Sequence, residues 1–529
     1  MKRKNLIFSC LLAILLIVLL QSGCVGSHQY RYKSAVEASD NCDAGSSLYP
    51  SNNETEKTPG SKCFEQKHSL PNIGSDAGES TSYSLNFLEF DETGQLFDER
   101  QFQSIFDIVR SQDTYLIVFI HGWRHDAAIA DEDVRRFRTL LGYAAAFVKQ
   151  RSLLDRYEHT KVAGLFVGWR GRAVADCGAL CTPYVAPTFF GQKATSDVLG
   201  PHVVGTLRKL EGAFAQNALQ RQASYANRML VIGHSFGGNI LASALSSEVV
   251  KQLERHEEGD TFSPPLGDLA LLINPASEAK RWTTIQEKVR ALGKVRGDNR
   301  LTYELFRLFP ATQRPVLVSM TSACSWPEGQ DVADDLRNRK VACDVPTGTY
   351  FPIARYLSGY RDADQVKTIG HLDPDPQQPP RSPLNSLGTS HEIELNGSAK
   401  IESNYQNAAY GKNTAKCAII DGWLRKAIDD KSAASASGYG EGWDTGHTAA
   451  TSLTPSSRKG KTLFAQVRHS TYRDWNGRII SGPRDPFWNM RALDTAISGH
   501  GGYMSYRVWC LVNQIVLDDP TSSTYSLKE

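Results

Sequence analysis

The sequence predicts an α/β fold in which a mostly parallel central sheet carries helices on both faces and long loop insertions. Short, continuous apolar segments recur between residues 114 and 320, as is typical of strands buried on both faces. Stretches with helical spacing of apolar residues separate these segments. Regular alternation of strand and helix favours a parallel sheet, because each helix returns the chain to the starting edge of the next strand.

Composition restricts the class of protein. The chain has 529 residues, of which 41% are hydrophobic and 22% charged, and its net charge is +2. This much apolar material is enough for a large core. Basic residues form no long block outside residues 1–4. Nucleic acid is therefore not an expected partner.

The amino terminus combines a basic cluster, an apolar run at 6–20, and Gln21-Ser22-Gly23-Cys24. The run is shorter than the roughly 20 residues of a spanning helix. The segment resembles a bacterial lipoprotein signal, although Gln21 stands where an aliphatic residue is usual. We expect residues 1–23 to be a signal peptide and Cys24 to be lipidated, anchoring the protein to the membrane of the cell envelope with its folded domain outside the cytoplasm. Ordinary cleavage and an uncleaved anchor are the alternatives, and all three export the chain.

Cysteine usage agrees with export. Beyond Cys10 and Cys24 the chain has eight cysteines, and an even number in an exported protein favours disulfides. The local spacing suggests the pairs 42–63, 177–181 and 324–343, which leaves 417–510. A metal site is not expected, because Cys177 and Cys181 have no second pair or histidine at zinc-ligand spacing.

We expect a polar tether at 24–80, one folded domain at 81–520 and a tail at 521–529. Insertions of loop composition are expected at 172–200, 325–342, 370–416 and 430–460. The first of them either walls a site at the carboxyl edge of the sheet or is a surface excursion. The expected strands are 82–90, 114–120, 162–167, 230–232, 268–274, 315–320, 463–467 and 487–493, and the expected helices are 98–110, 133–150, 203–219, 239–245, 277–292 and 503–516.

The central motif is Gly233-His234-Ser235-Phe236-Gly237, which follows an apolar run and precedes good helix formers. A strand that turns sharply into a helix, with serine at the apex, is a nucleophile elbow. Gly233 and Gly237 leave room where the strand and helix pass closely. The motif predicts Ser235 as a nucleophile and the N–H of Phe236 as an oxyanion-hole donor.

A second donor is expected at the end of the strand 114–120. That strand runs into His121-Gly122-Trp123, upstream of the elbow. The backbone N–H of Trp123 would complement that of Phe236 across the oxyanion.

These motifs resemble the α/β-hydrolase superfamily, in particular serine hydrolases of esterase and lipase type. The resemblance covers about residues 82–520. It implies a chain order of serine, then an acid after the next-to-last core strand, then histidine. The stretch Cys343-Asp344-Val345-Pro346-Thr347-Gly348, with Phe351-Pro352 beyond it, is similar to the acid segment of such hydrolases. Asp344 is the favoured acid and Asp331 the alternative.

The general base is expected in a glycine-rich loop between the last strand and the last helix. Ser498-Gly499-His500-Gly501-Gly502 occupies that position and makes His500 the favoured base. His447 lies in low-complexity sequence, and His469 follows a strand with no helix after it. Both are weaker candidates.

Together these residues predict an exported serine hydrolase that cleaves carboxylic esters through an acyl-enzyme. The substrate would be a small-molecule or lipid-like ester, and the chemistry needs no metal or organic cofactor. Two alternatives remain: another acyl chemistry on the same triad, such as a peptidase or acyltransferase, or a non-catalytic envelope lipoprotein that keeps the fold.

Overall fold

The structure is a computed structural model of the whole chain. It describes residues 28–35, 42–44, 53–55, 57–70, 81–152, 157, 159–172, 182–221, 227–294, 308–310, 312–322, 344, 346–371, 390–395, 416–417, 419–421, 453–454, 465–469, 485–492, 496–497, 499–504, 506–518 and 526–528.

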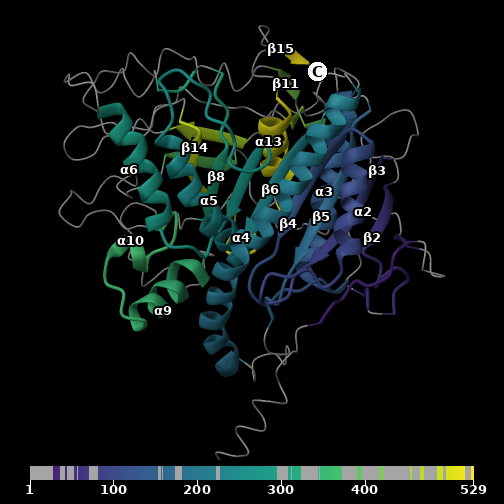
Figure 1. Ribbon diagram of the computed structural model, residues 1–529, viewed down its shortest axis with the longest axis horizontal. Coiled ribbons are helices and arrows are strands. Elements are labelled where there is room, and N and C mark those ends of the chain that lie inside the picture. Colours follow the sequence, from purple (N-terminus) through teal and green to yellow (C-terminus); the bar gives the residue numbers. More distant parts are fainter. Residues whose placement is uncertain are drawn as a thin grey trace, which may run out of the picture.

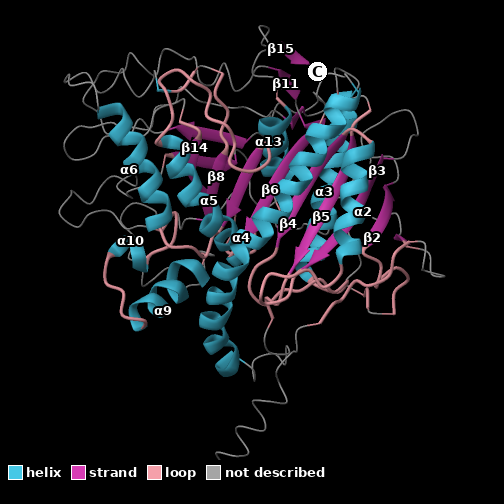
Figure 2. Cartoon of the chain, viewed as in Figure 1, coloured by secondary structure: helices cyan, strands magenta, loops and turns pink. Residues whose placement is uncertain are grey.

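One large sheet dominates the described residues, with helices on both of its faces (Figure 1 and Figure 2). Eleven strands form it, in the order β1-β2-β3-β5-β4-β6-β7-β8-β14-β9-β13. From β3 to β9 every neighbouring pair is parallel. The strands are β1 (Asp43–Ala44), β2 (Glu65–Leu70), β3 (Thr81–Glu89), β4 (Thr114–Ile120), β5 (Lys161–Gly168), β6 (Arg228–His234), β7 (Leu269–Ile273), β8 (Leu317–Ser322), β9 (His391–Leu395), β13 (Ala465–His469) and β14 (Phe487–Ala492).

The remaining elements are the main helices and two short strand pairs. Among the described helices, none combines the length and apolarity needed to span a membrane. The strand pairs are β10 (Lys416–Cys417) with β12 (Leu453–Thr454), and β11 (Ile419–Asp421) with β15 (Ser526–Lys528). The helices are α2 (Glu99–Ser111), α3 (Glu132–Ser152), α4 (Thr182–Arg221), α5 (Phe236–Leu253), α6 (Lys280–Lys294), the π-helix η2 (Pro346–Tyr350), α9 (Phe351–Leu357), α10 (Ala363–Val366) and α13 (Tyr506–Leu517).

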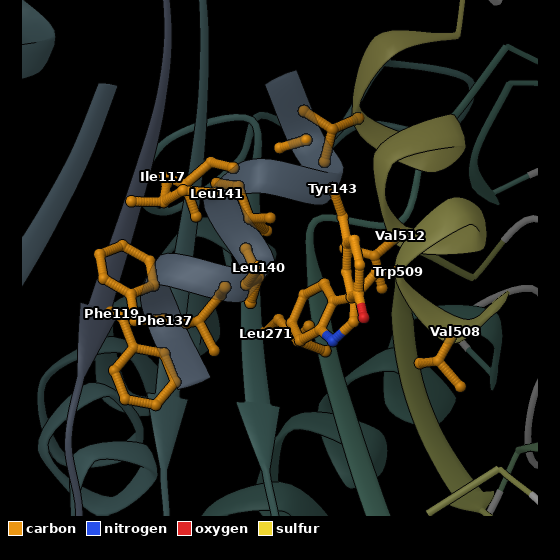
Figure 3. Packing of buried hydrophobic residues seen from close by; sticks show 14 of the residues in the cluster. Ile117, Phe119, Phe137, Leu140, Leu141, Tyr143, Leu271, Val508, Trp509 and Val512 are labelled. Carbon is orange, nitrogen blue, oxygen red and sulfur yellow. The ribbon is translucent and has the colours of Figure 1, made fainter. Parts of the chain in front are cut away.

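Side chains alternate between the two faces of the sheet and build two cores. β4 is buried along its whole length, as its continuous apolar sequence predicts. Its odd-numbered residues, such as Ile117 and Phe119, pack with α3 and α13, as Figure 3 shows for Phe137, Leu140 and Trp509. Its even-numbered residues pack with α2, α4, α5 and α6. A strand with apolar residues at every position is thus explained by helices on both faces.

The strand order changes direction around β4. The chain passes from β4 to β5 on one side and then returns to β6 on the other. In open parallel sheets, ligands bind outside the carboxyl ends of the strands at such a switch point. Here β4 ends at Ile120 and β6 at His234, so the segments 121–123 and 235–238 meet at this edge.

Residues 182–200, expected as part of a loop, are helical instead and form the first half of α4. Gly200 lies within this helix. In the structure, a Cβ on Gly200 would lie 2.2 Å from Ser243 Oγ and 2.9 Å from the carbonyl oxygen of Ile240 in α5. The glycine therefore allows two helices to pack closely and does not mark a turn.

Parts of the expected tether pack against the sheet. β2 extends the sheet beyond β3, and alternate β2 side chains are buried. The backbone N–H of Arg31 donates to Glu89, and its guanidinium donates to Ala127 O (2.8 Å). The predicted disulfide between Cys42 and Cys63 is present, and Cys510 is also disulfide-bonded. Folded structure thus begins before residue 82.

The expected insertion 370–416 contributes β9 to the main sheet. Its sequence, His391-Glu392-Ile393-Glu394-Leu395, alternates apolar and charged residues, and Ile393 is fully buried. The alternation is a strand signal that the surrounding polar composition concealed.

Candidate active site

Ser235 lies between β6 and α5 and has φ 56° and ψ −115°. Non-glycine residues rarely adopt this strained conformation, so the surrounding structure must enforce it. The Ser235 N–H donates to Ile273 O (3.0 Å), and its carbonyl accepts from the N–H groups of Asn239 (3.1 Å) and Ala276 (2.9 Å). These contacts with β7, the segment after it and α5 hold the serine at the carboxyl edge of the sheet.

Two glycines make the turn possible. A Cβ on Gly233 would lie 2.5 Å from the carbonyl oxygen of Gly237, and a Cβ on Gly237 would lie 2.0 Å from that of Ile120. Real Cβ atoms do not approach oxygens this closely. The close passage of strand and helix expected from the sequence is therefore confirmed in the geometry.

The segment after β4 packs directly against Ser235. A Cβ on Gly122 would lie 2.7 Å from Ser235 Cβ and 3.3 Å from its Oγ. The neighbouring Phe236 is the first residue of α5, so its N–H has no partner within the helix. The backbone of 121–123 and the start of α5 are thus both adjacent to the Ser235 side chain, as the predicted oxyanion hole requires.

The side chain of His121 stabilises the backbone of the segment 121–123. It is fully buried; its Nδ1–H donates to Gly122 O (2.9 Å) and its Nε2 accepts from the Trp169 N–H (3.1 Å). Trp169 Nε1 in turn donates to His121 O (2.9 Å). Burial lowers the pKa of His121, against a weaker opposing effect of the Gly122 carbonyl. Because both ring nitrogens are engaged in the neutral form, His121 holds the loop and is not available as a base.

Asp344 and His500 are far apart in the chain but in direct contact. His500 Nδ1 lies 2.8 Å from Asp344 Oδ1. Asp344 is buried, whereas the His500 side chain is 23% exposed. The hydroxyl of Thr347 also donates to Asp344 Oδ2, and the Thr347 N–H donates to Oδ1 (3.2 Å).

The electrostatics keep Asp344 ionised. Burial by itself raises the pKa of this carboxyl. The positive charge and hydrogen bond of His500, the charge of His371 and the hydrogen bond from Thr347 outweigh burial and lower the pKa to about 2. An ionised Asp344 can only accept, so in the neutral form of His500 the proton lies on Nδ1 and Nε2 can accept one.

Three buried side chains hold the backbone of the His500 loop. Asn274 Nδ2 donates to Gly499 O (3.1 Å) and His500 O (2.7 Å), and His234 Nε2 donates to His500 O (3.0 Å). Ser322 Oγ accepts from the Gly499 N–H (3.1 Å). Asn274 and Ser322 follow or end β7 and β8, while His234 is adjacent to Ser235. The loop of His500 is thus fixed to the same edge of the sheet as the elbow.

Asn274 also connects two strands. It has φ 44°, which Asn tolerates better than most residues, and its Oδ1 accepts from the Ser322 N–H (2.8 Å). No sequence motif marks Asn274 or Ser322 as functional. Their one detectable signal is their position, because each lies where a buried strand ends at the carboxyl edge.

A buried charged cluster lies behind His234. Asp133, which is fully buried, accepts from Tyr503 OH (2.9 Å) and lies 3.3 Å from Arg136 Nη1. The distances from Asp133 Oδ2 to His234 Nδ1 and His125 Nε2 are 3.5 and 3.6 Å. Burial raises the pKa of Asp133, but the charge of His125 and the contact with His234 outweigh this and lower it well below its usual range.

An aromatic wall adjoins the elbow. The Phe189 ring lies 4.8 Å from that of Phe236, 5.4 Å from that of Trp123 and 6.2 Å from that of Phe351, measured between centroids. Trp123 Nε1 donates to Thr188 Oγ1 (3.2 Å). The described part of this segment, 182–200, therefore walls this edge of the sheet with the first half of α4 and not with a loop.

The other candidates from the sequence lie elsewhere. Cys24, Asp331 and His447 lie outside the described residues. His469 ends β13, where it pairs with His391 at the edge of the sheet, two strands beyond β14. In the part of the chain that the structure describes, no three His, Cys, Asp or Glu side chains are grouped so that they could hold a metal ion.

Comparisons with known proteins give little. No family model matches the chain, and no curated protein matches it. Two solved structures of phospholipase PlaB from Legionella pneumophila are similar over part of it. The complex with thio-NAD has a TM-score of 0.18 and 11% identity, covering 53% of this chain and 46% of that one. The other has a TM-score of 0.17 and 12% identity, covering 54% and 48%. The chain thus spans about half the length of these structures, and at such scores neither supports an assignment.

Proposed function

We propose that this protein is a serine hydrolase with an α/β-hydrolase fold that cleaves carboxylic esters through Ser235, His500 and Asp344. One observation carries the proposal. An ionised, buried Asp344 bonds Nδ1 of His500, and the His500 loop is tied by hydrogen bonds to the residue beside a strained serine. A structural serine does not need this combination of elbow, base and acid.

The proposed reaction begins with attack of Ser235 Oγ on the ester carbonyl carbon while Nε2 of His500 takes the hydroxyl proton. The tetrahedral oxyanion accepts hydrogen bonds from the N–H groups of Phe236 and Trp123. The C–O bond to the alcohol then breaks, and His500 returns the proton to the leaving oxygen. Asp344 holds the imidazole in the required tautomer and stabilises the imidazolium.

Deacylation repeats these roles. Water attacks the acyl carbon and gives a proton to His500, the Ser235–acyl bond breaks, and the proton returns to Ser235 Oγ. The products are a carboxylic acid and free enzyme. Every proton transfer involves a residue of this chain, and no electron transfer takes place.

Labelling with a fluorophosphonate tests the activated serine. Wild-type protein should be labelled and should hydrolyse a short-chain soluble ester, and Ser235→Ala should lose both. Its thermal unfolding should stay within a few degrees of wild type, because alanine fits the turn at least as easily as serine. Ser246→Ala, which removes a hydroxyl from the same helix, is the matched control and should keep both activities. If Ser235→Ala retains ester turnover, the triad is wrong; a folded wild type that is not labelled favours a non-catalytic envelope protein.

We also propose export and anchoring through Cys24. The Cys42–Cys63 disulfide supports an oxidising compartment. Cells that express the wild-type protein should incorporate radiolabelled fatty acid into it, and Cys24→Ala should abolish the label. Wild-type protein that takes up no label would exclude lipidation at this cysteine.

A further inference from the structure

The chain presents a concentrated apolar surface next to the candidate site. Five of the nine exposed large hydrophobic side chains in the described residues lie within one stretch of eleven residues, 350–360. Side chains of this kind are normally scattered singly, and a contiguous group marks an interaction surface. We name it the α9 surface; it consists of Tyr350 (54% exposed), Ile353 (52%), Tyr356 (56%), Leu357 (74%) and Tyr360 (38%).

The α9 helix is apolar on two sides: one side is buried in the protein and the other faces solvent. Phe351 and Ala354 are buried and pack on the protein. Ile353 and Leu357 are one helical turn apart and point to solvent, so their exposure is not a by-product of folding. Core packing explains why Phe351 and Ala354 are apolar. The apolar character of Ile353 and Leu357 requires another explanation.

Two arginines lie at the border of this surface. Arg355 stacks on the Tyr360 ring at 3.5 Å and Arg361 on the Tyr356 ring at 4.1 Å. Arg355 is paired with Glu278 (3.2 Å), whereas Arg361 donates to the carbonyls of Tyr356 and Tyr360 and so keeps its charge available. Apolar side chains flanked by tyrosines and arginine match the boundary between acyl chains and anionic headgroups in a bilayer.

The α9 surface is connected to the site. Helix α9 follows η2 directly, and η2 follows Asp344 after one residue. Its buried Phe351 contacts Phe189, and Phe189 contacts Phe236. In Figure 2 α9 and one end of α4 lie beyond the arrowheads of β4 and β5, at the edge of the sheet where Ser235 lies. A bilayer contacting α9 would therefore lie at the same end of the molecule as the catalytic serine.

We infer that the α9 surface docks the domain on an anionic phospholipid bilayer, so that the proposed esterase takes its substrate from the lipid surface. That the bilayer supplies the substrate rests on the proposed function, whereas docking itself does not depend on catalysis. Docking needs partial burial of Ile353 and Leu357 in the headgroup region and attraction of Arg361 to lipid phosphates.

Activity distinguishes substrate in a membrane from substrate in solution. The double variant Ile353→Gln/Leu357→Gln should lose about tenfold or more in turnover of a long-chain ester embedded in vesicles of phosphatidylglycerol and phosphatidylcholine, because two apolar side chains no longer enter the bilayer. Its turnover of a short-chain soluble ester should stay within about twofold. Tyr32→Gln, which changes an exposed aromatic residue far from α9 in the sequence, should affect neither. A lipid anchor at Cys24 would be the same in all of these variants, so it would not produce a difference between them.

Hydrogen exchange tests docking without any need for catalysis. Adding the same vesicles to the full-length protein should slow amide exchange in peptides covering 350–360, more with anionic than with purely zwitterionic lipid, and the double variant should lose this protection. Unchanged exchange in the wild type would overturn the inference, even if soluble esters are hydrolysed. Loss of a dimer in the double variant, with no vesicle effect, would assign the surface to a second copy of the chain instead.

Discussion

The candidate nucleophile and its two partners are held in place in different ways. Ser235 is positioned by its own chain, because a continuous strand, turn and helix impose its conformation and Gly233 and Gly237 remove the atoms that would prevent it. Asp344 and His500 are 156 residues apart, and their position depends on side chains from other strands. A nucleophile built by local backbone geometry tolerates few substitutions within its motif, whereas the acid–base pair depends on distant polar contacts.

This difference predicts where substitutions will act on chemistry and where they will act on folding. Changes in the elbow glycines should disrupt the packing of β6 on α5, since no side chain fits there. Changes around His500 should leave the sheet intact and alter only the alignment of the imidazole. Asp344→Asn, Asn274→Gly and His125→Gln test the second half of the comparison, in order of decreasing effect on turnover, and each is set beside a further variant.

The largest effect is expected from Asp344→Asn. Asparagine keeps the shape but removes the charge and favours the wrong tautomer of His500, so kcat should fall about 10³–10⁴-fold. Steady-state kinetics on a soluble ester measure this fall in kcat, with wild type and variant compared at the same concentration of folded protein. The folded fraction must be matched because Cys343 is adjacent and disturbing its chemistry could imitate a catalytic loss.

Asp331→Asn is the matched control for this change and should stay within a few-fold of wild type. If Asp331→Asn shows the large loss and Asp344→Asn does not, the acid has been misassigned. The contact between Asp344 and His500 would then be a structural ion pair.

A smaller effect is expected from Asn274→Gly. Glycine accepts the positive φ of this position but removes the amide that donates to the carbonyls of Gly499 and His500. The His500 loop should shift, and kcat should fall about 10–10²-fold with little change in KM. Ser322→Ala, which removes another contact to the loop, should act in the same direction. If Asn274→Gly lowers the unfolding temperature but leaves kcat unchanged, the amide has no positioning role.

The smallest effect on turnover, within a few-fold, is expected from His125→Gln, which should instead change the pH dependence of stability. Burial lowers the pKa of His125, but the charge of Asp133 and the bond to Asp131 outweigh this and raise it to about 9. A folded-state pKa above the unfolded value stabilises the protein fully below the unfolded pKa of about 6.5, and this contribution is lost as pH rises through 9.

Denaturant unfolding of wild type and His125→Gln should therefore differ by about 3 kcal/mol at pH 6 and by less than about 1 kcal/mol at pH 9. Tyr503→Phe removes a hydrogen bond to the same Asp133 without removing a group that titrates in this range. Its cost should be nearly constant between these pH values. If the difference in unfolding free energy between wild type and His125→Gln is also the same at pH 6 and pH 9, His125 is not charged in the folded protein.

Features that depend on neighbours in the chain could be predicted from the sequence. The strands 114–120 and 162–167 agree with β4 and β5 within a residue or two, because continuous apolar runs have few structural alternatives. The disulfide of Cys42 and Cys63 agrees with its prediction because the two cysteines are close in sequence. In contrast, 172–200 was expected to be a loop, but residues 182–200 form the first half of α4, where Gly200 packs closely against α5.

The sequence by itself determined the elbow at Ser235, the alternation that builds a parallel sheet, and the order of the candidate serine, acid and histidine along the chain. Each depends on periodicity or on the sterics of adjacent residues, which are local properties. Only the tertiary structure brought Asp344 within 2.8 Å of His500 and revealed Asn274 and Ser322 as the side chains that hold its loop. Those contacts join residues from different strands, and which strand ends meet at one edge is set by the order of strands in the sheet, which no local pattern encodes.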